Sequence, residues 1–234
     1  MVEEKYAGRY GKKMCLDLLL DASESESIPF DVKDLQDHIA TIMLGEKCYN
    51  ELDGIFNGSD RKPTPEDLVR MKYLEQVIKE GLRLYPSVPL LSRHVPQDIQ
   101  MGDNYVVPAG TVMLLDLSSL HRDPKYFPDP EKFDPDRFSP ENCIGRHPFA
   151  YVPFAAGSRS CIDIDFFFFF FFAGQKFAML EEKVVLSYIL RNFTVESDGD
   201  LNDLRVAFSL VLRPFKTLNV KFKPRTAPAR DKYL

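Results

Sequence analysis

Apolar residues recur at every third or fourth position in five stretches of the chain, which is the spacing of an amphipathic helix. The predicted helices cover 13–22, 31–44, 46–56, 65–85 and 174–191. The longest has a start signal, because Thr64 suits the N-cap, Pro65 the first helical position and the acidic residues after it the first turn.

Two other regions contain short alternating runs separated by Gly, Pro or Asn, which is typical of strands and turns. They lie between 86 and 112 and from 193 to 223, with a turn expected near Lys216 and Thr217. Residues 116–160 are rich in Pro and predict a long irregular connection. The pattern therefore predicts a mainly α fold with small antiparallel β-sheets, in the α+β class.

Composition narrows the possible classes of function without choosing one. The 234 residues are 44% hydrophobic, which is enough for a sizeable core in one large domain or in part of a larger one. A net charge of −5 without basic blocks gives no indication of nucleic-acid binding. None of the cysteines forms a CxxC pair, and no segment reaches the ~20 apolar residues of a membrane span.

Two weak motifs involve charged residues. Glu80 and Arg83 lie about one helical turn apart, so a carboxylate and a guanidinium share one face of the predicted helix. Arg137, between two phenylalanines, is a candidate third member of that group. Each alone is also compatible with an exposed residue, since surface ion pairs are common and contribute only ~0.3–0.5 kcal/mol.

The sharpest motif is the pattern FxxGxRxC formed by Phe154, Gly157, Arg159 and Cys161. Glycine allows a tight or left-handed turn close to a flat cofactor, and arginine offers a fixed cation to a heme propionate. The cysteine thiolate can bind iron, and phenylalanine can shield its sulfur from water. A buried structural cysteine remains the alternative for Cys161 taken alone.

In this order and at these separations, the three motifs closely resemble the C-terminal half of a cytochrome P-450, a heme-thiolate monooxygenase. Three short segments are similar to parts of this family. YLEQVIKE is similar to its K helix, HRDP with FPDP to its approach to the meander, and FAMLEEK to its L helix. The run RHPFAYVPF before AGSRSC is most like family 4. The resemblance covers nearly the whole chain.

The resemblance implies that residues 1–234 form a partial cytochrome P-450 domain. Its segments would be the start of the I helix (31–45), the K helix (65–85), the meander (116–152), the heme-thiolate loop (153–162), an aberrant insert (163–173), the L helix (174–191) and the C-terminal strands (193–223).

The resemblance also implies the residues that would hold the cofactor. Cys161 would be the axial ligand of the heme iron, and Arg159 and Arg93 would bind the propionates. Phe154 and Gly157 would lie against the heme. Histidine is the alternative type of iron ligand, but each histidine is expected to be a satisfied polar or surface residue: His38, His94, His121 and His147.

Other residues would support the site or contact substrate. Glu80, Arg83 and Arg137 would be structural and would join the K helix to the meander. The expected substrate contacts are Val88, Pro89, Leu90, Phe208 and Ser209.

Two departures from the family pattern bear on activity. After Gly45 the sequence passes to a segment that resembles one just before the K helix, so the acid–alcohol pair of the I helix is missing and no catalytic residue is retained. Residues 163–173, with seven consecutive phenylalanines, separate Cys161 from the L helix, whose N-terminal dipole would lower the thiol pKa.

The resemblance therefore implies an oxidoreductase that inserts one atom of dioxygen into a fatty-acid-like, steroid-like or xenobiotic lipophilic substrate, impaired in this chain. The cofactor would be heme b, with electrons from NADPH through NADPH-cytochrome reductase. The parent protein would be anchored in the endoplasmic reticulum membrane and face the cytosol, although the sequence shows no anchor. The alternative is a catalytically inactive heme-binding remnant or a mis-assembled gene model.

Overall fold

The structure is a computed structural model that describes residues 45–157, 160, 174–197, 206–208, 211–215 and 219–225. The helices predicted over 13–22 and 31–44, the insert 163–173 and the turn near Lys216 lie outside these residues. Within the described ranges, no helix is long and apolar enough to cross a membrane.

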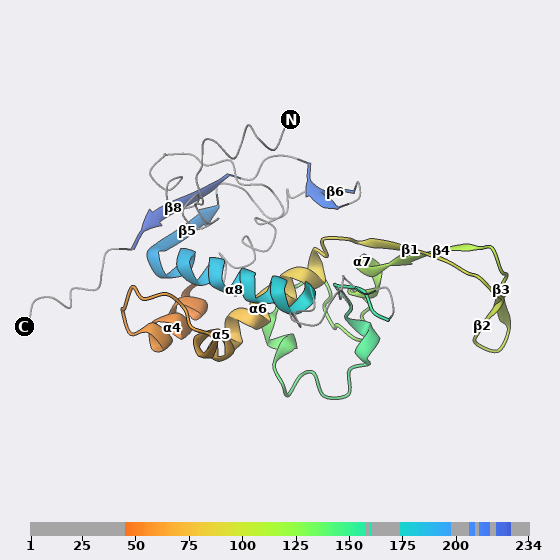
Figure 1. Cartoon of the computed structure of the whole chain (residues 1–234), viewed down its shortest axis with the longest axis horizontal. Coiled ribbons are helices and arrows are strands. Elements are labelled where there is room, and N and C mark those ends of the chain that lie inside the picture. Colours follow the sequence, from red (N-terminus) through yellow and green to blue (C-terminus); the bar gives the residue numbers. More distant parts are fainter. Residues whose placement is uncertain are drawn as a thin grey trace, which may run out of the picture.

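Helices form the main body of the molecule (Figure 1). They are α4 (Gly45–Phe56), α5 (Pro65–Arg70), α6 (Lys72–Leu84), α7 (Leu117–Leu120) and α8 (Gly174–Asn192), with short 3-10 helices η1 (Pro135–Phe138) and η2 (Pro148–Ala150). Apolar side chains of α4, α6 and α8 meet in one buried core. Its members are Cys48, Leu52, Phe56, Met71, Leu74, Val77, Ile78, Leu82, Leu186 and Leu190.

The helix predicted over 65–85 is divided in two at Met71, and in this respect the sequence prediction is wrong. Met71 has φ −73° and ψ 73°, which is not helical, and its side chain is fully buried in the core. The break frees the first N–H groups of α6. Two of them, on Tyr73 and Leu74, donate to the Glu51 carboxylate of α4 at 2.7 and 3.0 Å.

The predicted start of this region is confirmed. Thr64 caps α5 by accepting a hydrogen bond from the Asp67 N–H, and the Asp67 carboxylate accepts one from the Thr64 N–H at 2.8 Å. Pro65 occupies the first turn. The Arg61 guanidinium pairs with Asp67 and, together with the Thr64 N–H, holds the pKa of that carboxyl well below its usual range.

The described strands form four antiparallel pairs. These are β1 (Leu90–His94) with β4 (Val112–Asp116), β2 (Ile99–Met101) with β3 (Tyr105–Val107), β5 (Phe193–Ser197) with β8 (Val220–Pro224), and β6 (Val206–Phe208) with β7 (Leu212–Pro214). The predicted class, mainly α with small antiparallel sheets, is therefore confirmed.

The first two strand pairs extend away from the helices as one long ribbon, with the β2–β3 turn at its tip (Figure 1). Leu90 lies opposite Asp116, so the ribbon returns the chain to the end of α6. The meander, residues 116–152, then runs alongside α6 through α7, η1 and η2. This path brings segments far apart in sequence to one side of α6.

A buried lysine attaches α8 to the two helices before the ribbon. The Lys183 ammonium donates to the Leu68 carbonyl oxygen at 3.0 Å and to the Glu75 carboxylate at 2.6 Å. Burial alone would raise the pKa of Glu75, but hydrogen bonds from Lys183 and Lys79 lower it to about 2. The polar contact therefore fixes the position of α8 on the core.

Candidate functional site

The centre of the candidate site is a fully buried ion pair on α6. Arg83 donates from Nε and Nη2 to the two carboxylate oxygens of Glu80, at 2.7 and 2.9 Å. The same guanidinium donates to the backbone oxygens of His121 at 3.0 Å and Lys132 at 3.2 Å. Both charged side chains are 0% exposed, so the alternative of a solvated surface pair does not apply.

The meander supplies further contacts to the same carboxylate. The Asp134 N–H donates to Glu80 Oε1 at 2.8 Å, and Arg137 Nε lies 3.5 Å from that oxygen. Arg137 also donates from Nη2 to the Asp129 carbonyl oxygen at 2.9 Å. The structure thus brings Glu80, Arg83 and Arg137 together, and the group joins α6 to η1 and the loop before it.

A second set of contacts fixes the chain just before the FxxGxRxC pattern. The Tyr151 hydroxyl donates to the Lys79 carbonyl oxygen at 2.9 Å, and the Val152 N–H donates to His121 Nε2 at 3.0 Å. The Tyr151 ring packs on His121, with ring centroids 5.2 Å apart. Burial, with the nearby Arg83 cation, lowers the pKa of His121 to about 4, so its ring is neutral at pH 7.

The FxxGxRxC pattern begins as a turning loop. Phe154 is partly buried and packs against the helical core, and Ala155 has a positive φ of 61°. Gly157 has φ +81°, which glycine adopts without a steric penalty, and a Cβ there would meet nothing described within 4 Å. Arg159 and Cys161 lie outside the described residues.

Arg93, the second expected cofactor arginine, lies on β1 opposite Met113. Its side chain is partly buried, and Nη1 donates to the Ser92 carbonyl oxygen at 2.9 Å. The hydrogen bonds of Glu80 with Arg83 and Asp134 do not involve Arg93. Because Arg93 lies on β1, it is on a different element from the loop at 153–157.

The expected substrate segments meet at the end of α6. The Leu212 N–H donates to the Ser87 carbonyl oxygen at 2.9 Å, and the Leu117 N–H donates to the Pro89 carbonyl oxygen at 2.8 Å. The β6–β7 pair therefore lies against the segment that contains Val88, Pro89 and Leu90. Phe208 is the last residue of β6, whereas Ser209 lies outside the described residues.

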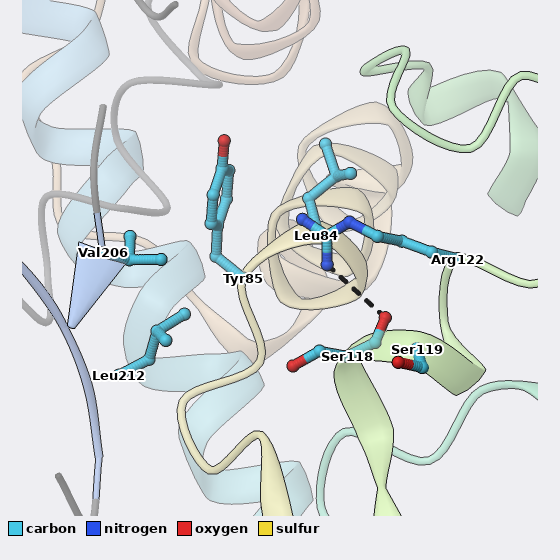
Figure 2. A pocket seen from close by; sticks show the side chains of 7 residues that line it. All are labelled: Leu84, Tyr85, Ser118, Ser119, Arg122, Val206 and Leu212. Atoms are coloured by element: carbon cyan, nitrogen blue, oxygen red, sulfur yellow. Dashed lines mark hydrogen bonds between the residues drawn. The ribbon is translucent and has the colours of Figure 1, made fainter. Parts of the chain in front are cut away.

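A cavity of about 530 Å³ opens between these elements, as Figure 2 shows. Apolar side chains of β6 and β7 face the end of α6, while Arg122 and two serines of α7 form the polar side. Arg122 donates to the Ser118 carbonyl oxygen at 3.5 Å. The lining residues are Leu84, Tyr85, Ser118, Ser119, Arg122, Val206 and Leu212.

Sequence reasoning did not assign His121 to the site. The histidine was expected to be a satisfied polar or surface residue. It is a polar residue with 0% exposure, and its Nε2 accepts the hydrogen bond that anchors Val152. No hydrogen bond within the described residues reaches its Nδ1. The only signal in the sequence was its place in the HRDP motif, which does not indicate a contact with Val152, 31 residues later.

Comparisons with known proteins agree with this arrangement. The family model described as Cytochrome P-450 matches residues 16–222. Human cytochrome P-450 4V2 is 42% identical over 94% of this chain, and Drosophila melanogaster cytochrome P-450 4c3 is 41% identical over 93%. The chain covers 44% and 43% of these two relatives, so it spans less than half of their length.

A solved structure, the crystal structure of a cytochrome P-450DA heme domain, has a TM-score of 0.69 and 27% sequence identity to this chain. The likeness covers 82% of this chain and 40% of that one. A mutant of the same heme domain has a TM-score of 0.71. By family model, by sequence and by structure, the chain belongs to the cytochrome P-450 family.

Proposed function

We propose that this chain is the heme-binding part of a heme-thiolate monooxygenase that inserts one atom of dioxygen into a lipophilic substrate. The observation that carries the proposal is the path of residues 151–157. The Tyr151 hydroxyl and the Val152 N–H anchor this segment, and the chain then turns through Gly157 with φ +81° directly before Arg159 and Cys161.

The proposed cofactor is heme b, a flat, dianionic group, and two described residues support it. Among the described residues, nothing lies within 4 Å of a Cβ built on Gly157, which would let a planar group approach the backbone, and the apolar ring of Phe154 lies three residues before it. Cys161 is the proposed axial ligand, and Arg159 and Arg93 are the proposed partners of the propionates. Heme iron with a thiolate ligand supplies the activation of dioxygen.

The chain's own residues would hold and shield this group. Phe154 would exclude water from the Cys161 sulfur. Hydrogen bonds and electrostatic interactions with that sulfur are stronger when water is excluded. Glu80, Arg83 and Arg137 would act at a distance by fixing the meander, and hence the start of the loop, to α6. None of these three would touch the substrate.

The lipophilic substrate would be fatty-acid-like, steroid-like or xenobiotic. Support comes from the hydrogen bond that joins Leu212 to Ser87, since it brings the β6–β7 pair beside Val88, Pro89 and Leu90. Phe208 and Ser209 are the other proposed substrate contacts. Electrons would come from NADPH through NADPH-cytochrome reductase, and the site of action would be the cytosolic face of the endoplasmic reticulum membrane.

A second candidate function is heme binding without turnover. The sequence favours it, because the acid–alcohol pair expected after the start of the I helix is missing and residues 163–173 separate Cys161 from α8. A chain without a proton-delivering pair would hold heme but would not complete the oxygen chemistry. The two candidates share the same cofactor site and differ only in turnover.

The test is the absorption spectrum of the purified chain after addition of heme, reduction and exposure to carbon monoxide. A red-shifted Soret band typical of thiolate ligation is expected for the chain and for Cys143→Ser, a matched control at an exposed cysteine. Cys161→Ser should lose the band. A band typical of imidazole ligation, or no heme uptake by any of the three, would overturn the proposal for this chain.

A further inference from the structure

One residue joins the buried ion pair to the loop that precedes Cys161. His121 uses its backbone oxygen to accept from Arg83 Nη1 at 3.0 Å and its ring Nε2 to accept from the Val152 N–H at 3.0 Å. The side chain is 0% exposed and stacks against Tyr151. Through its backbone oxygen and its side chain together, this one residue connects α6, the meander and the segment 151–157.

We propose that His121 is a positioning residue for the heme-binding loop, and that it acts by holding the Val152 N–H with a neutral ring nitrogen. This rests on the proposed function, in which the loop carries the iron ligand. Val152 lies only two residues before Phe154, and five before the Gly157 turn. Release of its N–H would free the start of the loop while leaving the core around α6 in place.

The hydrogen bond from the Val152 N–H requires the His121 ring to be neutral, with Nε2 as the acceptor. An Nε2 that accepts from a backbone N–H cannot itself carry a proton, so the neutral ring has its hydrogen on Nδ1. The charged groups that face the ring are cations, Arg83 from α6 and Arg122 from the meander, and both disfavour a protonated ring. The backbone oxygens of Leu82 and Arg83 act in the opposite direction, but burial is the larger effect.

A pH dependence follows from this arrangement. In an unfolded chain the ring takes up a proton near its ordinary pKa of about 6.5, whereas in the folded chain the pKa is about 4. The anchored loop is therefore fully favoured above about pH 6.5 and is lost progressively as the pH falls toward 4. Protonation removes the Nε2 acceptor and places a third cation beside Arg83 and Arg122.

Two variants separate this role from simple packing. His121→Gln keeps an acceptor oxygen near the position of Nε2 but does not titrate, and His121→Leu fills space without an acceptor. The first readout is hydrogen exchange at the Val152 amide in the heme-free chain at pH 7. We expect exchange at least tenfold faster in His121→Leu than in wild type, and within about threefold of wild type in His121→Gln.

The Phe127 amide, which donates to the Asp123 carbonyl oxygen within the meander, is the internal control and should not change. The second readout is pH. Wild-type protection at Val152 should disappear between pH 6.5 and 4, and His121→Gln should retain it to lower pH. If His121→Leu does not fold, the comparison of wild type with His121→Gln across this range decides the question.

The third readout is heme release to an excess of a heme-free acceptor protein, which we expect to be at least tenfold faster in His121→Leu than in His121→Gln. Equal Val152 exchange in the two variants, or an acid transition at the same pH in wild type and His121→Gln, would overturn the inference. If no variant takes up heme, the proposed function fails, while Val152 exchange still decides the role of His121.

Discussion

Replacement of Glu80 by glutamine tests whether the buried ion pair holds the helical core to the meander. The native carboxylate accepts from Arg83 at 2.7 and 2.9 Å and from the Asp134 N–H at 2.8 Å. An amide of the same shape offers one oxygen, and its NH₂ group would face another donor. Arg83 would also be left as a buried cation without its counter-charge.

The expected loss follows from these contacts. Breaking one side of a buried charge pair costs about 3–5 kcal/mol, and the amide recovers part of this with its remaining oxygen. We therefore expect Glu80→Gln to lower the free energy of unfolding by about 3 kcal/mol. Urea denaturation followed by far-ultraviolet circular dichroism measures this value at pH 7.

The matched control is Glu131→Gln, the same change of carboxylate to amide in an exposed ion pair. Glu131 pairs with Arg122 at 3.0 Å, but its side chain is 75% exposed. Such pairs contribute at most about 1 kcal/mol, so the control should change stability little. A loss below about 1 kcal/mol for Glu80→Gln, or one equal to the control, would refute the structural role that we assign to the pair.

Three further predictions concern other parts of the chain. Gly157→Ala should lower the free energy of unfolding by about 1–2 kcal/mol, because Gly157 has a positive φ. Gly54 is a solvent-exposed residue within helix α4, so Gly54→Ala should raise the free energy of unfolding by about 0.5–1 kcal/mol. Urea denaturation measures both changes. Lys183→Met should cost about 1–2 kcal/mol in the same assay, because the Leu68 carbonyl oxygen and the partly buried Glu75 carboxylate lose this donor; an unchanged midpoint would contradict this. An alkylating reagent at pH 8 should modify the exposed Cys143 within minutes and leave Cys48 intact by mass spectrometry, since burial raises the pKa of Cys48 to about 12.

The sequence predicted those structural features that depend only on residues close together in the chain. The Thr64 cap, the Pro65 start and the Glu80–Arg83 spacing each involve residues within one turn of helix, and the structure contains the contacts that they imply. Motif order supplied the family, which the comparisons confirm. These features needed no knowledge of how distant segments pack.

Features that depend on distant contacts were predicted only where the family resemblance supplied them, as for the contact of Glu80 with Arg137. The division of the helix at Met71 has no Pro or Gly to mark it, and its free N–H groups are satisfied by Glu51 from another helix. The burial of Glu80 and Arg83 comes from the meander, which lies about 40 to 50 residues later in the chain. The contact between His121 and Val152 likewise joins residues 31 positions apart, beside the hydrogen bond from Tyr151 to Lys79 of α6.

The long ribbon of β1 to β4 has a consequence for how the isolated chain behaves in solution. Its two-stranded sheets leave backbone donors and acceptors at both outer edges within the described residues, and Val112 and Leu114 are 63% and 68% exposed. Unpaired edges with apolar side chains are templates for adding a strand from another molecule. Among the described residues, the outer edges of this ribbon are therefore where we expect a strand from another molecule to add.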